Sequence, residues 1–285
     1  MDKLLALALA GACGVAAAQT PATNPMPDGS RDMYVGLSAV SAPRYEGGRE
    51  RRVSALPVLQ VQWSNGIFVS GQSAGMHLSD QPAVEYGPLI AVLARRDDSG
   101  SSRGLGGVEG MGLSNALAPP LSLRARYDAT HLSGMDKIGY RLQAGGFFNV
   151  YLTPSLRLTN SLLYGSGHDR NGLRWTADLQ QLAMPLGAHH ALSLTAGLTL
   201  ANRNDSQSYF GVSAAEAARS INPAYNAGGG LRDAHVGVRW NWALTPAWML
   251  TTNLNAARLL GSAKDSPLAE RPANVTVSTA IAYRF

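Results

Sequence analysis

The sequence predicts an all-β protein, a transmembrane antiparallel β-barrel of about 12 strands. Three observations predict it. Short segments alternate between apolar side chains and small or polar ones, turn residues separate these segments, and aromatic side chains gather near the segment ends. Successive side chains of a strand point to opposite faces, so this alternation gives a lipid-facing band and a polar lumen. Counts of about 10 or about 14 strands also fit the pattern.

Residues 1–18 have the features of a secretory signal peptide. Lys3 supplies a positive start, Leu4–Ala10 a short apolar core, and Ala16–Ala18 the small residues of a cleavage site. We therefore expect cleavage before Gln19. The chain's single cysteine lies inside this segment, so we expect neither disulfide nor thiol chemistry in the mature protein.

The composition of the remaining chain favours an exported barrel. The formal net charge is +5, yet the arginines do not gather in one segment, so no nucleic-acid partner is expected. No apolar run is long enough for a transmembrane helix. Residues 19–30 are rich in proline and polar side chains, which indicates a flexible periplasmic leader. The barrel then occupies residues 31–285.

The predicted strands follow one another at short spacing after the leader. Turn residues such as proline, glycine, asparagine and aspartate punctuate the chain between them. Alternation is clearest in the late segments, where leucine, valine and tryptophan alternate with serine, threonine, glycine and arginine. We place the strands at 33–41, 53–63, 66–79, 83–95, 121–130, 138–151, 155–164, 172–185, 190–202, 232–244, 248–260 and 274–285.

The order of turns and loops predicts an orientation. Bacterial single-chain barrels have an even number of strands, short periplasmic turns and longer outer loops. Counting back from Phe285 puts short turns at 152–154, 186–189 and 245–246 in the periplasm. The same count treats 96–120 as a periplasmic excursion and leaves the weak segment 105–115 out of the barrel. It places the segments 165–171, 203–231 and 261–273 outside.

The last strand, 274–285, is the expected closing strand. Its odd positions carry apolar side chains and end in Tyr283 and Phe285, while its even positions are small or polar. A terminal aromatic on the lipid side is the signal that outer-membrane barrels present to the outer-membrane assembly machinery. We therefore expect integral insertion in the bacterial outer membrane, with outer-membrane lipid and lipopolysaccharide as surroundings.

A soluble β-sandwich is the main alternative fold. Its strands also alternate, but its outward face is polar and charged. Here the apolar face keeps its aromatic residues near strand ends, as in the belts at the two interfaces of a membrane. Trp63, Tyr151, Trp242 and Trp248 fall toward one end, which favours the barrel.

Segment 203–231 predicts a folded outer loop. Ser213 and Glu216 have the spacing of a capping box, in which the serine caps the third helical amide and the glutamate reaches back. Residues 214–219 are good helix formers, so we expect a short helix there. Asn226–Gly230 should supply backbone with positive φ. Such a loop either closes the barrel mouth or only shields its rim.

The inward face carries more arginine than acid. Two readings remain open: an anion-attracting pore, or an internal network of charges that packs a small barrel. In the second reading, partners come from the early strands, with Glu85 as one example. The candidate lumen charges are Arg124, Arg126, Asp128, Arg141, Arg157, Arg174, Asp178 and Arg239, and Arg284 shares their phase.

The sequence gives little sign of an enzyme. Some outer-membrane barrels are lipid hydrolases that pair serine with histidine, and His131 and Ser133 share one strand face. The same tripeptide recurs at 77–79, as expected by chance in a serine-rich chain, and neither copy has an acidic partner motif. His189 and His190 are adjacent, so they do not form a metal-ligand pair on one strand face. We expect no catalysis, metal or cofactor.

Four segments in the last third of the chain carry distinctive motifs: 209–220, 224–231, 258–267 and 282–285. They resemble the signature segments of the MltA-interacting protein (MipA/OmpV) family. Upstream, 45–48 and Leu56-Pro57 also fit the family's start, while Ser262 stands where the family usually has aspartate. Within the first two signature segments, the candidate signature-loop residues are Tyr209, Phe210, Gly211, Ser213, Glu216, Tyr225, Gly228, Gly229 and Gly230.

The resemblance implies an outer-membrane protein with several described roles. One member is a scaffold that joins a lytic transglycosylase, which degrades murein, to a murein synthase. Others are described as adhesins or porins. Three functions therefore stand: a non-enzymatic scaffold, a small-solute pore of anionic preference (or an adhesin), and, with least support, a lipid hydrolase.

Overall fold

The computed structural model describes residues 31–79, 81, 83–101 and 131–285. The expected signal peptide and leader lie outside the described residues. So do the predicted strand 121–130 and the candidate lumen charges Arg124, Arg126 and Asp128. Within the described residues, no helix is long and apolar enough to cross a membrane.

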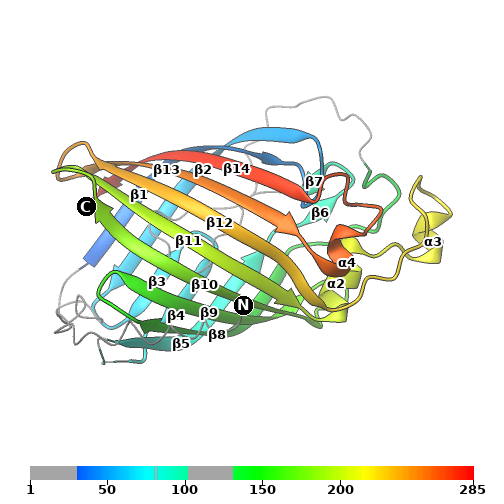
Figure 1. Ribbon diagram of the computed structural model, residues 1–285, viewed down its shortest axis with the longest axis horizontal. Helices are drawn as coiled ribbons and strands as arrows, with labels where there is room; N and C mark the ends of the chain where they lie inside the picture. Colours follow the sequence, from blue (N-terminus) through cyan, green and yellow to red (C-terminus); the bar gives the residue numbers. More distant parts are fainter. Residues whose placement is uncertain (1–30, 80, 82, 102–130) are drawn as a thin grey trace, which may run out of the picture.

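Twelve antiparallel strands close into one barrel, as the alternating pattern predicts (Figure 1). Each strand pairs with its neighbour along the barrel, and β1 pairs with β14 to close the ring. The strands are β1 (Arg31–Pro43), β2 (Arg51–Trp63), β3 (Ile67–Ser70), β4 (Ser73–Met76), β5 (Val84–Leu93), β8 (Arg141–Tyr151), β9 (Leu156–Ser166), β10 (Gly172–Pro185), β11 (His190–Ala201), β12 (Gly230–Ala243), β13 (Trp248–Leu259) and β14 (Ala273–Arg284).

Short elements outside the barrel wall complete the described structure. Two strands of two residues form a small separate sheet, and the helices follow the long strands β11 and β13. These elements are β6 (Arg96–Asp97), β7 (Gly100–Ser101), α2 (Arg203–Phe210), α3 (Ala214–Ala217) and α4 (Gly261–Lys264).

The prediction of one strand over 66–79 is wrong, because the chain turns back at Gly71-Gln72. Gly71 has a φ of 56°, and Ser70 pairs with Ser73 across a two-residue turn. Turns of this length need positive φ at their first central residue, which glycine adopts at little cost. The result is the hairpin β3–β4 in place of one long strand.

The hairpin reverses the direction expected for β5, the described barrel strand between it and β8. The strand β5 therefore runs toward the long loops and pairs directly with β8 from Val84–Val150 to Leu93–Arg141. The expected periplasmic position of 96–120 is wrong for its described part, 96–101. The amide of Ser101 donates to the carbonyl of Arg44, which directly follows β1. Residues 96–101 therefore lie at the barrel end where β1 finishes, opposite the end with the short turns.

The barrel has two unlike ends. We call one the short-turn end, because its turns span only a few residues and it holds the C-terminal Phe285. We call the other the loop end, because the long connections and the helices gather there (Figure 1). The segments of the loop end are 44–50, 94–101, 131–140, 167–171, 202–229 and 260–272.

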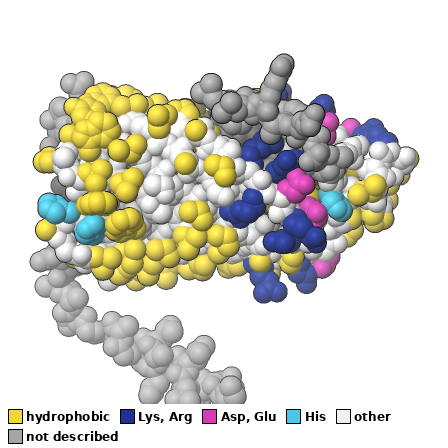
Figure 2. Space-filling view, turned by 90° about the horizontal axis from the view of Figure 1, so that it is seen from above, with side chains coloured by type: hydrophobic (Ala, Val, Ile, Leu, Met, Phe, Trp, Pro, Cys, Tyr) yellow, Lys and Arg dark blue, Asp and Glu magenta, His cyan; other side chains and the backbone are white. Residues whose placement is uncertain are grey.

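The barrel wall is apolar outside, and its inner face carries buried polar side chains together with small apolar clusters, mainly on the early strands. Val53 is 73% exposed and Leu37 66% exposed on the outer face, whereas Ser54 and Ser38 point inward and are buried. Figure 2 shows the hydrophobic side chains spread over much of one side and the charged ones gathered toward the loop end. This division is the one expected of a barrel whose wall faces lipid.

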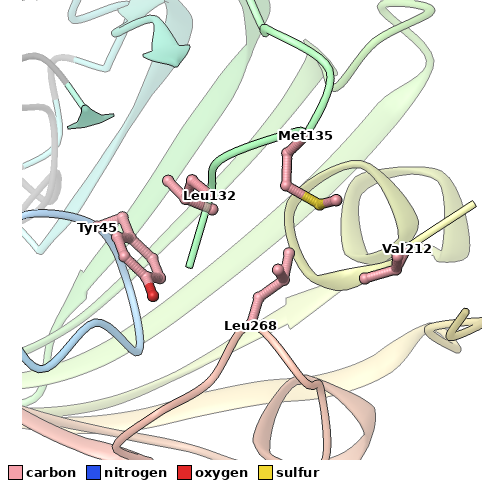
Figure 3. Packing of buried hydrophobic residues seen from close by; sticks show 5 residues of the cluster. All are labelled: Tyr45, Leu132, Met135, Val212 and Leu268. Atoms are coloured by element: carbon pink, nitrogen blue, oxygen red, sulfur yellow. The ribbon is translucent and has the colours of Figure 1, made fainter. Parts of the chain in front are cut away.

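The loop end has its own small hydrophobic core. Tyr45, Leu132, Met135, Val212 and Leu268 come from four different connections and pack together, all less than a tenth exposed (Figure 3). Burying such side chains together stabilises the loops at roughly 25 cal/mol per Å² of apolar surface. The loop end is therefore a folded structure and not a set of independent loops.

Contacts between two of these loops also clasp the seam where β1 meets β14. The hydroxyl of Tyr45 donates to Glu270 Oε2 at 2.9 Å, and the amide of Arg271 donates to the carbonyl of Gly47 at 2.8 Å. On the wall itself, the Arg51 guanidinium reaches across β1 and donates to the carbonyl of Val275 at 2.7 Å. We call these three contacts the seam clasp.

Candidate functional site: the closed lumen and its mouth

Helix α2 lies at the barrel mouth because its first residues are capped and anchored. The Asn202 side chain accepts from the amide of Asp205 at 3.0 Å, as an N-cap residue does. Asp205 sits in the first turn, where the helix dipole favours negative charge. The helix ends at Phe210, followed by Gly211.

Asp205, which is fully buried, is the centre of an ionic group at the mouth. Its carboxylate receives Arg174 Nη2 at 3.0 Å, Arg232 Nη1 at 3.1 Å and the hydroxyl of Ser166 at 2.6 Å. Arg232 also pairs with Glu46 from the loop between β1 and β2. Three strands thus bring a donor to one carboxylate, and the β1–β2 loop joins them through Arg232. We call these residues the mouth group.

The C-terminal end of α2 is held by Arg96. Its guanidinium donates to the carbonyls of Tyr209 and Ser208 at 2.6 and 3.0 Å. Helix C-termini leave carbonyls without helical partners and favour cations, so this arginine satisfies both needs. Burial lowers the pKa of Arg96, although Tyr209 and Glu216 oppose that shift.

The Tyr209 ring packs among three guanidinium groups. Arg96, Arg174 and Arg232 each place their Cζ atom 5.5 to 5.8 Å from the ring centroid, within the range of cation–π attraction. Burial raises the pKa of Tyr209, so the ring stays neutral. Beneath it lies a cavity of about 140 Å³, lined by these arginines together with apolar residues such as Leu93 and Phe210.

A second ionic group lies on the inner face near the middle of β10 and β12, on either side of β11. His235 places Nε2 2.7 Å from Asp178 and Nδ1 3.0 Å from Asp233, and all three residues are buried. A neutral imidazole donates through one nitrogen only, so a doubly protonated ring satisfies both carboxylates. Gly197 lies between them on β11, and a Cβ there would stand 1.8 Å from Asp178 Oδ1.

A third group lies on the inner face nearer the short-turn end. Arg157 lies 3.7 Å from Glu85 and donates to Gln180 and to the hydroxyl of Tyr151. Glu85 also accepts from Asn149 and from Tyr151 at 2.9 and 2.8 Å. Glu85 is the early-strand residue that the sequence suggests as a partner for an inward arginine.

The other candidate lumen charges are placed as follows. Arg141 donates to the carbonyls of Gly167 and His168 at the loop end, and Arg239 donates to Asn253 on the neighbouring strand. Arg284 lies over the ring of Tyr34 near the short-turn end. The structure thus brings Arg157 and Arg174 to carboxylates, while Arg141 and Arg239 have neutral partners.

The capping box and the short helix of the outer loop are confirmed. The amide of Ser213 donates to Glu216 and the amide of Glu216 donates back to Ser213 Oγ, at 2.8 and 3.2 Å. Burial opposes ionisation of Glu216, but donors from Asp136 and Ser213 hold its pKa below the usual value. Helix α3 is shorter than predicted and ends at Ala217.

The prediction of positive φ over Asn226–Gly230 holds for Gly230 alone, with a φ of 128°. At Gly229 a Cβ would stand 2.7 Å from the amide nitrogen of Arg203, so close approach explains that glycine. Gly228 offers its carbonyl to Ser262 Oγ at 2.6 Å, and Tyr225 donates to the carbonyl of Ser262. These bonds tie the signature loop to α4.

The expected assembly residues lie at the short-turn end on the outer face. The rings of Tyr283 and Phe285 stack with centroids 6.3 Å apart, and Trp248 packs against Tyr283 at 5.1 Å. Both Tyr283 and Phe285 are exposed. Their part in assembly stays a prediction.

Sequence reasoning missed several residues that build the lumen. Asp205, Arg232 and Glu46 of the mouth group fall in or beside loops, where alternation says nothing about direction. Asp233 and His235 do share the inward phase of Arg239, so that phase was an available signal. The hydrolase candidate His131 lies 3.5 Å from Glu270, and its neighbour Leu132 belongs to the loop-end core.

A closed barrel with an apolar outer band and paired, buried charges inside defines an integral outer-membrane β-barrel. The family model described as MltA-interacting protein MipA matches residues 35–285. The chain therefore belongs to the MipA family. No curated protein sequence matches it.

Solved barrels resemble the chain only distantly. A bacterial polysaccharide outer-membrane secretin is 10% identical, with 89% of this chain and 98% of that one covered and a TM-score of 0.44. An outer-membrane channel from Pseudomonas putida F1 is 12% identical, with 95% and 100% covered and a TM-score of 0.41. The outer-membrane protease OmpT from Escherichia coli is 10% identical, with 90% and 96% covered and a TM-score of 0.28.

Proposed function

We propose that this protein is a non-conducting, non-enzymatic scaffold that holds a murein-remodelling enzyme at the outer membrane. The observation that carries the proposal is the state of the lumen. Three groups of paired polar side chains, centred on Asp205, His235 and Arg157, follow one another along the inner face from the mouth to the short-turn end, and apolar clusters line other parts of that face. Charges that already have partners offer little to a passing ion.

The proposed partner is a lytic transglycosylase, because the family description names an interaction with MltA. Murein lies in the periplasm, which the short-turn end faces if both termini are periplasmic. Three turns there begin with exposed leucines: Leu152 and Leu186 are 58% and 57% exposed, and Leu244 is 39% exposed. Apolar side chains repeated around one rim would give a partner a contact surface.

Affinity capture with the full-length barrel tests the proposal. A variant with Leu152, Leu186 and Leu244 changed to serine should lose a partner that the wild type retains. That partner must digest purified murein, so capture of an unrelated protein does not count. Ile221→Ser is the matched control, because this side chain is 79% exposed at the opposite end. Equal retention of a murein-cleaving enzyme by all three proteins would contradict the proposal for this surface.

An anion-preferring pore is the second candidate, favoured by the arginines that line the mouth cavity. Conductance in planar bilayers separates the two functions. We expect the wild type to be silent, because Arg174 and Arg232 are held by Asp205. Steady chloride-selective conductance would overturn the scaffold proposal in favour of the pore.

A further inference from the structure

Three arginines gather on the outer wall of the barrel at the loop end, beside the seam. Arg51 begins β2, Arg258 lies near the end of β13, and Arg271 comes two residues before β14; all three are exposed. Figure 2 shows basic side chains, with some acidic ones among them, at this end of the molecule next to the hydrophobic surface. We call these three residues the rim arginines.

The barrel register brings the rim arginines to the first residues of β14. Arg258 is paired with Ala273 on β14, and the Arg51 guanidinium donates to the carbonyl of Val275. Adjacent strands lie about 4.8 Å apart, so β13 and β2, separated by β14 and β1, are roughly 15 Å apart. Because the Arg51 side chain extends across β1 to β14, its guanidinium is closer to Arg258 than the two strands are to each other. The remaining distance is comparable to the size of a large lipid headgroup.

The carboxylates nearby already have other partners. Glu50 pairs with Arg44 at 3.1 Å, Glu270 accepts from Tyr45, and Glu46 pairs with Arg232. Among the described residues, no ion pair includes a rim arginine. The positive charge of the rim arginines is thus directed outward.

The position of the rim arginines selects the kind of anion. Val53, two residues from Arg51 on the same face, is 73% exposed, and Val275 and Leu254 are 40% and 47% exposed beside the other arginines. These arginines therefore stand at the boundary of the apolar band. A ligand that fits has acyl chains for the band and a phosphate for the guanidinium groups.

We infer that the rim arginines bind the phosphate groups of a phosphorylated glycolipid in the outer leaflet. Guanidinium forks match phosphate oxygens in geometry and charge. Arg51 is already oriented, because Ser41 and Val275 accept from its two terminal nitrogens and leave its Nε–H for a ligand. Arg258 and Arg271 supply the further donors.

Lipid binding to the purified full-length barrel tests this inference. The probes are a diphosphorylated lipid A in detergent micelles and the same glycolipid without its phosphates, with retention measured by native mass spectrometry. The wild type should prefer the phosphorylated probe by at least about tenfold, the effect of one or two charge-assisted hydrogen bonds. A variant with all three rim arginines changed to glutamine should lose that preference.

Arg170→Gln is the matched control, because Arg170 is an exposed loop-end arginine in the turn between β9 and β10. It should keep the wild-type preference. Heat-modifiable mobility on gels shows that each variant is a folded barrel. If the triple variant does not fold, Arg258→Gln alone serves, since the described side chains show no hydrogen bond from its guanidinium, and it should reduce the preference several-fold.

Two results would overturn the inference. One is equal retention of both probes by the wild type, or an undiminished preference in the folded triple variant. The other is displacement of the lipid by inorganic pyrophosphate at a concentration equal to that of the lipid, which would make the rim a site for soluble phosphate. Lipid preference that resists pyrophosphate and depends on the rim arginines supports it.

Discussion

Contacts within the loop end of this barrel join residues that are far apart in the sequence, whereas contacts within the short-turn end join residues that are close together. At the short-turn end, Thr245 accepts from the amide of Trp248, three residues on. At the loop end, Tyr45 bonds Glu270 across 225 positions of sequence, and Arg232 bonds Glu46 across 186. The conformation of the short turns therefore depends on neighbouring residues, whereas the mouth forms only after strands distant in sequence have paired.

This difference predicts where substitutions cost most. The pairs of Asp205 with Arg174 and Arg232 at the loop end are buried, so removing one partner leaves another charge without compensation. Contacts in the short turns are exposed, and water replaces them. The following experiments test that contrast, beginning with the largest expected effect.

Asp205→Ala should destabilise the barrel most, by about 3–5 kcal/mol, the range for breaking a buried pair. Arg174 and Arg232 would both lose their shared carboxylate. Thermal unfolding followed by gel mobility measures the loss. Asp265→Ala is the control, because its pair with Lys264 is exposed and worth at most about 1 kcal/mol. Similar losses of stability in both variants would contradict the distinction between buried and exposed ion pairs.

Gly197→Ala should cost about 1–3 kcal/mol, the range for overpacking. Its new Cβ would stand 1.8 Å from Asp178 Oδ1 and push the mid-lumen carboxylate away from His235. Gly237→Ala faces the same lumen from β12, but its nearest neighbour is 3.5 Å away, so it should be nearly neutral. Urea unfolding of both variants gives the comparison, and a neutral Gly197→Ala would refute the crowding argument.

Ser213→Ala should lower the free energy of local unfolding of the outer loop by about 1 kcal/mol, the usual contribution of an N-cap side chain. The effect stays local, because the Ser213 contacts lie within α3. Limited proteolysis between 211 and 225 should speed up several-fold while the barrel's melting temperature hardly moves. Unchanged cleavage would show that the loop-end core alone holds α3.

Acid should loosen the same loop. Folding lowers the pKa of Glu216 below its ordinary 4.5, so its stabilisation is complete at higher pH. It is lost as the pH falls from 4.5 through the folded value. Hydrogen exchange of 211–225 between pH 7 and pH 3 measures this loss. In Glu216→Gln the loop should lose this acid dependence, since glutamine keeps the capping geometry without a titrating group.

Thr245→Val at the short-turn end should have the smallest effect, below about 1 kcal/mol. The hydroxyl accepts from the amides of Ala247 and Trp248, both open to water. Thermal unfolding beside Asp205→Ala completes the comparison of the two ends. A loss as large as that of Asp205→Ala would show that the short turns also carry global stability.

Sequence reasoning reached what local patterns decide. Alternation assigned Val236 and His235 to opposite faces of β12, and the Ser213–Glu216 spacing located α3. It did not find the hairpin at Gly71, because a glycine within an alternating run also fits a strand. Nor did it find the partners of Asp178 or Asp205, since these depend on which strands face one another once the barrel is closed.

The seam clasp implies an order of events in folding. Tyr45 and Glu270, like Gly47 and Arg271, belong to loops that flank the first and last strands. Joining these loops costs chain entropy, and the contacts that offset this cost form only when β1 and β14 lie side by side. These contacts should therefore be among the last to appear and should oppose reopening of the ring. A probe attached at Tyr45 would report when the barrel closes during folding.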